Sequence, residues 1–342
     1  MNNRFLIDYD NPDAGIGHSM GILNRAIKIA KRNGLQFAYS EKQLLKSHKQ
    51  SLSWNLKQFL RKLRGKAAYE THNIGDDLNR MLELKKILPS REDLEQKIKR
   101  GEVKVIELPA FEIHIPTNDQ VDDEIYKTID EFMQRHPGPN IAFKISNNRF
   151  GDYEYGSTRD WFIKAYTQAR EYFPIPTAYD PKQINIALHI RRGDLLPGRQ
   201  FSDLSSRMLP DAWYLEIVNT ILKNLPNSVA IHIFSEGKDG QYHSEAGEPF
   251  SWKAYFKNTP YLVYEHIDSD FMGTFHHLLH ADILIGSKSG MSHLAGMLGD
   301  QVKLMPHMWH SYRGANKLLE LPNAQSEIDL QALTSHIKSN LD

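Results

Sequence analysis

The sequence predicts an α/β fold made of two domains, each with a parallel β-sheet. Short apolar stretches of strand length alternate with segments whose apolar residues recur every three or four positions, which is the pattern of strand–helix–strand units. A glycine-rich turn joins the first strand to the first helix. The chain has 342 residues, which is more than a single hydrophobic core usually serves.

The first half contains one clear strand–turn–helix–strand unit. Arg4 to Asp8 has the apolar character of a short buried strand, and a turn over 11–17 leads into a helix that stops at Gly34. Further strands are expected at 35–39, 103–108 and 141–145, helices at 122–135 and 158–172, and a charged helical insertion at 41–100.

The second half alternates more regularly, which predicts a doubly wound parallel sheet. Strands are expected at 184–190, 229–234, 262–264, 282–286 and 302–305, and helices at 211–224, 271–280, 289–298 and 328–339. We place the domain boundary in the proline-containing segment 173–183, so that the domains span 1–178 and 179–342.

Composition excludes several classes of function. The chain has no cysteine, so it has no disulfide, thiolate zinc site or cysteine nucleophile. Lys plus Arg and Asp plus Glu each number 42, which argues against a nucleic-acid partner. No apolar run approaches the roughly 18 residues of a membrane span. We therefore expect a cytoplasmic protein.

The turn after the first strand is a candidate ligand-binding element. It runs through Gly15, Ile16, Gly17 and His18 and opens a helix, where free backbone N–H groups attract anions. The spacing of its glycines differs from the dinucleotide fingerprint, because the third glycine, Gly21, does not fall at the position that the fingerprint requires. A plain tight turn is the alternative interpretation.

The strongest chemical signal follows the strand at 184–190. There the segment His189-Ile190-Arg191-Arg192-Gly193-Asp194 places a histidine and two arginines where the strand ends. Unpartnered charges are costly at such a place, and the planar fork of arginine suits the charge of a diphosphate leaving group. A salt-bridge cluster with Asp194 is the alternative.

This segment resembles the His-x-Arg-Arg-x-Asp signature of α1,6- and α1,2-fucosyltransferases, which protein O-fucosyltransferases share in looser form. Three further segments resemble the same family: the helix start Arg207-Met208-Leu209-Pro210-Asp211-Ala212-Trp213-Tyr214, the strand Ile231-His232-Ile233-Phe234-Ser235-Glu236, and the serine-rich turn that follows Ala281 to Gly286. The resemblance covers roughly residues 184–300. It implies a GT-B-like fold with two Rossmann-type domains whose parallel sheets face a central cleft.

The resemblance also implies roles for individual residues. Arg191 would bind the β-phosphate of GDP-fucose and stabilise the departing GDP, and His189 would contact the nucleoside. Asp268 or Asp270 would accept the guanine N–H groups. The other donor-binding residues expected from these motifs are Arg192, Asp194, Gly15, Gly17, Arg207, Ser235, Glu236, Ser287, Lys288, Ser289 and Ser292.

Transfer with inversion needs a base for the acceptor hydroxyl, or a leaving group good enough to dispense with one. Asp13 and His18 in the first turn are our candidates. The expected activity is metal-independent transfer of fucose from GDP-fucose to a glycan or glycolipid, with no cofactor. The alternatives are another sugar nucleotide, a sugar-nucleotide 2-epimerase, or a non-catalytic carbohydrate-binding protein of the same fold.

Two other patterns carry weaker hypotheses. His276, His277 and His280 have helical spacing and suggest a metal, although a helix packed on the sheet explains them as well. A basic amphipathic stretch around 42–66 suggests a peripheral contact with a membrane that carries a lipid-linked acceptor, or simply a solvated helix face.

Overall fold

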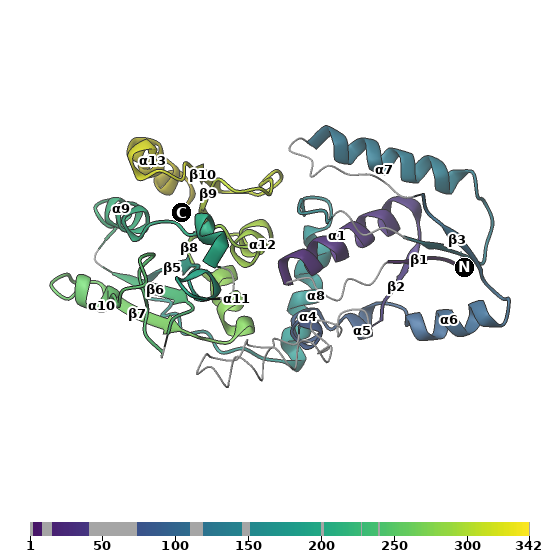
Figure 1. Cartoon of the computed structure of the whole chain (residues 1–342), viewed down its shortest axis with the longest axis horizontal. Coiled ribbons are helices and arrows are strands. Elements are labelled where there is room, and N and C mark those ends of the chain that lie inside the picture. Colours follow the sequence, from purple (N-terminus) through teal and green to yellow (C-terminus); the bar gives the residue numbers. More distant parts are fainter. Residues whose placement is uncertain are drawn as a thin grey trace. The chain divides into compact units, whose positions relative to one another are not determined.

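The computed structural model describes residues 3–8, 16–40, 74–109, 119–145, 151–199, 202–226, 228–238 and 240–341. The chain divides into two compact units, Met1–Pro174 and Ile175–Asp342 (Figure 1). Each unit contains one parallel sheet, so the predicted α/β architecture with two parallel sheets is confirmed. The predicted boundary after residue 178 lies four residues beyond this division. The expected acceptor and donor roles of the two units stay predictions, and so does the expected cleft between their sheets.

The first unit has a four-stranded sheet in the order β2-β1-β4-β3. Its strands are β1 (Arg4–Ile7), β2 (Gln36–Ala38), β3 (Lys104–Glu107) and β4 (Ile141–Lys144), all parallel. Its helices are α1 (Ile16–Asn33), α4 (Ile74–Leu82), α5 (Leu84–Ile87), α6 (Arg91–Lys99), α7 (Asp119–Gln134) and α8 (Arg159–Tyr172). Figure 1 shows α7 and α6 on opposite sides of this sheet.

The core of the first unit follows from the apolar face of its elements. In α1, the residues at helical spacing are buried, among them Leu23 and Ile27. On the other side of the sheet, Leu94 of α6 packs against Phe5 and Ile7 of β1. The helix α6 begins at a capped end, where the Ser90 hydroxyl accepts a hydrogen bond from the Asp93 N–H at 3.2 Å.

The second unit has a six-stranded parallel sheet in the order β10-β9-β8-β5-β6-β7. Its strands are β5 (Ile184–Ile190), β6 (Val229–Ser235), β7 (Leu262–Ile267), β8 (Ile283–Ile285), β9 (Val302–Pro306) and β10 (Leu318–Leu321). The strands β6 and β7 follow on one side of β5, and β8, β9 and β10 follow on the other. This is the strand order of dinucleotide-binding folds, and it creates a switch point between β5 and β8.

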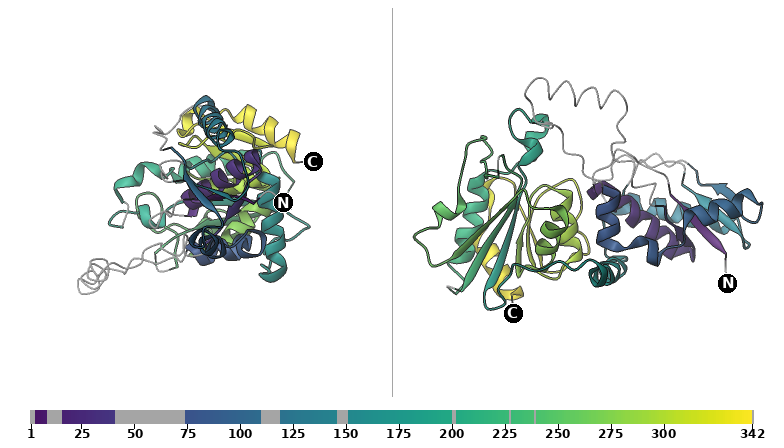
Figure 2. Two further views of the ribbon diagram at one scale, coloured as in Figure 1. Left: turned by 90° about the vertical axis from the view of Figure 1, so that its right-hand side faces the viewer. Right: turned by 90° about the horizontal axis from the view of Figure 1, so that it is seen from below.

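Helices cover both faces of this sheet (Figures 1 and 2). They are α9 (Asp211–Leu222), α10 (Trp252–Tyr255), α11 (Phe271–His280), α12 (Gly290–Leu298) and α13 (Leu330–Asn340), with short 3-10 turns η1 (Gly193–Leu195), η2 (Ser202–Arg207) and η3 (Gln325–Glu327). Figure 1 shows α9 and α13 on one side and α11 and α12 on the other.

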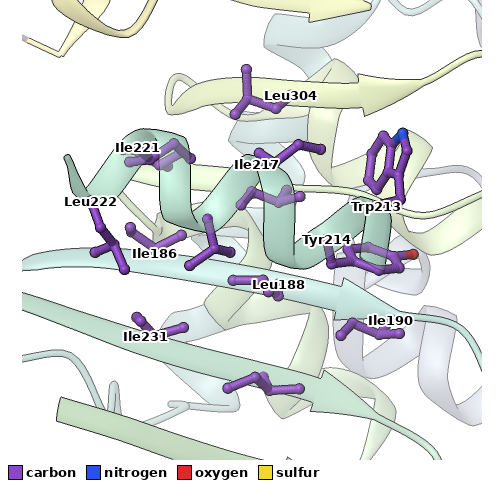
Figure 3. Packing of buried hydrophobic residues seen from close by; sticks show 14 of the residues in the cluster. Ile186, Leu188, Ile190, Trp213, Tyr214, Ile217, Ile221, Leu222, Ile231 and Leu304 are labelled. Carbon is purple, nitrogen blue, oxygen red and sulfur yellow. The ribbon is translucent and has the colours of Figure 1, made fainter. Parts of the chain in front are cut away.

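Strand alternation sends successive side chains of β5 to opposite faces. Ile186, Leu188 and Ile190 pack with Trp213 and Ile217 of α9 in the main hydrophobic core, as Figure 3 shows. The residues between them therefore face the helices on the other side. His189 is one of these residues, which fixes where the first residue of the arginine signature lies.

Two elements of the second unit were missed from the sequence. The strand β10 (Leu318–Leu321) lies at the edge of the sheet and is only four residues long. The helix α10 (Trp252–Tyr255) is a single turn inside the segment that we expected to be a long loop. Both are too short for their own periodicity to identify them. Among the described helices, none is long and apolar enough to cross a membrane. The basic stretch around 42–66 lies outside the described residues.

Candidate functional site

The candidate site lies at the carboxyl ends of β5 and β8, which are adjacent strands of the second sheet. The chain leaves β5 toward one side of the sheet and returns through β8 on the other. Loops that diverge at such a switch point leave room for a ligand, and this is where open α/β sheets bind their ligands. Here the diverging loops are the arginine signature after β5 and the serine-rich turn after β8.

Three buried side chains tie these two loops together. His189 Nδ1 lies 2.5 Å from Ser292 Oγ and 3.2 Å from Ser287 Oγ. The backbone N–H of Ser287 donates to Ser292 Oγ at 3.1 Å. Residues that are about a hundred positions apart in the sequence thus form one hydrogen-bonded cluster across the switch point.

The environment of His189 keeps its imidazole neutral. Burial, together with the positive charge of Arg191, lowers the pKa of His189 to about 3. Ser287 and Ser292 have exposed fractions of 1% and 0%, so neither hydroxyl is available as a nucleophile. We conclude that this cluster holds the loops in register, and the nucleoside contact predicted for His189 stays a prediction.

Arg191 and Arg192 are neighbours in sequence with different surroundings. Arg191 is partly exposed at the end of β5, and its charge acts on His189. Arg192 is fully buried, and its Nη2 donates to Asp211 Oδ1 at 2.6 Å, at the first residue of α9. Tyr242 also donates its hydroxyl to this carboxylate.

The structure therefore gives Arg192 a setting that differs from the donor-binding role we expected. Because a buried guanidinium is stable only with a partner, Asp211 explains Arg192 without any ligand. The Arg192 Nη1 also donates to the carbonyl of Arg191 at 3.0 Å. Arg192 thus fixes the backbone that carries Arg191. The side chain of Asp194 lies outside the described part of the chain.

The loop after β5 lies close against the end of β6. Gly193 has φ +33°, and a Cβ at this position would collide with the side chain of Glu236. Ser235 is buried and donates its hydroxyl to the Ile190 carbonyl at 2.7 Å. Ser235 therefore holds the ends of the strands together, whereas Glu236 is exposed at the same edge.

Asp268 and Asp270, the candidate guanine acceptors, both bind backbone N–H groups. Asp268 Oδ1 accepts from the Gly237 N–H at 2.8 Å. Asp270 is the N-cap of α11, and its Oδ1 accepts from the Gly273 N–H at 2.9 Å. Each carboxylate is exposed and has a structural role, which weakens the case that either one is dedicated to a guanine base.

The turn after β8 prepares the start of α12. Ser289 is the N-cap of this helix, and its hydroxyl accepts from the Met291 N–H at 3.3 Å. Lys288 is partly exposed, and its Nζ donates to the Ser206 carbonyl at 3.4 Å. Arg207, the next residue, has its guanidinium carbon 4.5 Å from the centre of the Trp309 ring. The serine turn, η2 and the loop after β9 therefore adjoin.

The remaining catalytic candidates belong to the first unit. Gly17 and His18 lie in the first turn of α1, and His18 Nδ1 is 2.9 Å from the hydroxyl of Tyr153. Burial, with a contribution from Arg25, lowers the pKa of His18. Asp13 and Gly15 lie outside the described residues.

The histidines of α11 act as packing and hydrogen-bonding groups. His277 Nδ1 donates to the Gly273 carbonyl at 2.7 Å, and its Nε2 accepts from the Ala178 N–H at 2.9 Å. His280 Nδ1 lies 2.8 Å from the His276 carbonyl. Within the described ranges, no group of three His, Asp or Glu side chains is arranged to hold a metal ion.

Sequence reasoning missed two functional neighbours of the predicted residues. Tyr153 contacts His18 from 135 positions away, and Asp211 pairs with Arg192 across 19 positions. Tyr153 has no local sequence pattern that marks it as a partner of His18. Asp211 did carry a signal, because the helix dipole favours an acidic residue in the first turn of a helix.

Acid is expected to destabilise the second unit. Burial lowers the pKa of His189 and His232 to about 3 and that of His266 and His293 to about 4. The unfolded chain binds these protons near pH 6.5 (about the free value), so stability is complete above that pH and is lost as pH falls toward the folded values. For each histidine, the free energy of unfolding falls by about 1.4 kcal/mol per pH unit in this range. Thermal unfolding followed by circular dichroism should show a constant Tm above neutrality and a falling Tm below it.

Two variants test the source of this pH dependence. His293→Gln keeps a donor for the Ser311 carbonyl, which now accepts from His293 Nε2 at 2.8 Å, and should flatten the fall in Tm. The matched control His280→Gln changes an exposed side chain and should leave the slope unaltered. A Tm that stays level on acidification would contradict the assignment.

Comparisons with known proteins show weak structural similarity. No protein-family model matches the sequence, and a search of curated proteins finds no significant match. Among solved structures, the chain is similar to E. coli heptosyltransferase WaaC with ADP-2-deoxy-2-fluoro heptose, at 14% identity and a TM-score of 0.42, over 98% of this chain and 99% of that one.

Two further solved structures show the same level of similarity. E. coli ADP-heptose lps heptosyltransferase II has 11% identity and a TM-score of 0.39, over 99% of this chain and 98% of that one. The spinosyn rhamnosyltransferase SpnG complexed with spinosyn aglycone has 13% identity and a TM-score of 0.35, over 100% and 92%. At these scores, no conclusion about function rests on them.

Proposed function

We propose that this chain is an inverting, metal-independent glycosyltransferase of the GT-B class that transfers fucose from GDP-fucose to a glycan or a lipid-linked glycan. The observation that carries the proposal is the cluster of His189, Ser287 and Ser292. It joins the arginine signature to the serine turn at the switch point of a sheet with dinucleotide-binding strand order. The sequence resemblance to fucosyltransferases supports the choice of donor.

In this proposal Arg191 acts on the leaving group. The acceptor oxygen forms a bond to the anomeric carbon, the bond from that carbon to the diphosphate oxygen breaks, and the electron pair leaves with GDP. The guanidinium of Arg191 stabilises the charge that develops on the β-phosphate. Arg192, buried on Asp211, holds the backbone of Arg191 in place before the donor arrives.

The proton of the acceptor hydroxyl goes to a base, for which His18 and Asp13 are the candidates. The lowered pKa of His18 keeps its imidazole neutral near pH 7, which is the state that a general base requires. The contact with the Tyr153 hydroxyl fixes the orientation of the ring. His18 therefore combines a suitable protonation state with a fixed position in the first unit.

A donor other than GDP-fucose is the second candidate. Asp268 and Asp270 each accept a backbone N–H at 2.8 and 2.9 Å, so neither is reserved for the guanine edge. A donor with a nucleobase other than guanine would need no carboxylate at the positions of Asp268 and Asp270. The phosphate-side residues are the same for both candidates, so the arginine variants described below do not separate them.

Thermal-shift measurements with a panel of nucleotides distinguish the donors. Without added metal, GDP is expected to raise Tm more than UDP, CMP or ADP, because a ligand that binds only the folded state stabilises it by mass action. At about a hundred times Kd this gain is about 2.7 kcal/mol. Stabilisation by UDP alone would remove GDP-fucose and leave the second candidate. The loss of transfer activity in EDTA would contradict the metal-free mechanism.

A further inference from the structure

The loop after β9 presents an indole at the surface of the second unit. Trp309 has an exposed fraction of 42%, whereas Trp213 and Trp252 of the same unit are completely buried. An exposed tryptophan loses the large hydrophobic gain that its burial would bring. Its flat apolar face offers a ligand a surface on which to stack.

Hydrogen bonds from buried side chains hold the backbone around this indole in place. His293 of α12, with an exposed fraction of 1%, donates from Nε2 to the Ser311 carbonyl at 2.8 Å. The Tyr312 hydroxyl donates to the Pro306 carbonyl at 3.0 Å. The indole N–H of Trp309 itself donates to His310 Nε2 at 2.9 Å. A ring fixed in this way loses little conformational entropy when a ligand stacks on it.

One cation lies over the indole, and a second contacts the backbone next to the first. The guanidinium carbon of Arg207 is 4.5 Å from the ring centre, which is a cation–π contact. Lys288 Nζ donates to the carbonyl of Ser206, the residue before Arg207, at 3.4 Å. Within the described ranges, neither cation has a carboxylate within ion-pair distance. Burial also lowers the pKa of Lys288, and an anion nearby would favour its charged form.

We propose that Trp309, Arg207 and Lys288 form a subsite for a ring that carries a phosphate group. The ring stacks on the indole, and the phosphate binds the guanidinium and the ammonium group. Two sources offer this chemistry: the nucleotide part of the donor and a phosphorylated sugar of the acceptor. The choice of these two sources rests on the proposed function, whereas the contacts themselves do not.

The subsite is tested by titrating the full chain while tryptophan fluorescence is recorded. The probes are GDP, glucose 6-phosphate, guanosine, glucose and pyrophosphate. GDP or glucose 6-phosphate, which combine a ring with a phosphate, should quench the fluorescence of Trp309. This is the part of the tryptophan fluorescence that the variant Trp309→Phe lacks. Trp309→Leu should weaken binding of that probe at least about fivefold, the smallest loss typical of a stacked base.

The charged half of the subsite has its own variants. Arg207→Gln and Lys288→Gln should each weaken the binding of the ring-bearing phosphate but leave the binding of guanosine and glucose unaffected. The matched control is Lys338→Gln, an exposed lysine on α13, which should change nothing. Circular dichroism and Tm of each variant confirm that the second unit is folded.

The outcomes separate the subsite from the proposed function. A Trp309-dependent response to GDP supports the subsite and assigns it to the donor, and one to glucose 6-phosphate assigns it to the acceptor. If GDP raises the Tm of the wild-type chain but binds Trp309→Leu equally well, and glucose 6-phosphate gives no signal, the subsite is overturned and the proposed function stands. If glucose 6-phosphate binds at Trp309 while GDP stabilises nothing, the GDP-fucose donor fails and the subsite stands. If pyrophosphate binds as tightly as both ring-bearing probes, and Trp309→Leu changes none of these affinities, then no ring stacks on Trp309 and the proposal is overturned.

Discussion

Replacing Arg191 by lysine is expected to lower kcat by at least about a hundredfold, as does the loss of one preorganised donor to a developing oxyanion. Lysine keeps the positive charge but loses the planar fork that binds two phosphate oxygens at once. Because Arg191 is partly exposed, the substitution should leave Tm close to the wild-type value. Steady-state kinetics with GDP-fucose and the acceptor, together with thermal unfolding, measure both quantities.

A matched control for this variant lies elsewhere on the same unit. Lys338→Arg is the opposite substitution, lysine to arginine, on an exposed face of α13. It should leave kcat and Tm unchanged. If Arg191→Lys turns over at a near-normal rate, Arg191 is a structural residue and the leaving group is stabilised elsewhere. A fall in Tm that matches the fall in activity would lead to the same conclusion.

The adjacent Arg192 is expected to respond in the opposite way. Arg192→Leu leaves the carboxylate of Asp211 without its buried cation, and breaking such a pair typically costs about 3–5 kcal/mol. For a unit of this size, that loss corresponds to a fall in Tm of roughly 10 °C. Urea unfolding gives the free energy directly, and the protein that remains folded should still bind GDP.

A double variant separates the ion pair from simple packing. Arg192→Leu with Asp211→Asn removes both charges, so a large part of the lost stability should return. Asp211→Asn alone should destabilise the unit, since it leaves Arg192 buried with a weaker partner. If Arg192→Leu unfolds at the wild-type urea concentration but no longer binds GDP, the original donor-binding prediction for Arg192 is correct.

These two arginines also show the limit of sequence reasoning. The sequence alone predicted that the strand at 184–190 ends in a charged motif, because an apolar run followed directly by His-x-Arg-Arg has a clear periodicity and a sharp end. It could not distinguish Arg191 from Arg192. The partner of Arg192 is Asp211, and only the packing of α9 on the sheet brings the two together.

The same division holds for the whole site. Local pattern sufficed for both parallel sheets apart from the edge strand β10, and for the end of the strand before Arg191 and the start of the helix after Ser289, since propensity, caps and strand ends are properties of neighbouring residues. Only the tertiary structure decided that His189 closes on Ser287 and Ser292, that Tyr153 contacts His18, and that Arg207 lies over Trp309. These contacts join residues about a hundred positions apart. They are set by the order of strands and the facing of helices, and a single sequence contains no local signal for either.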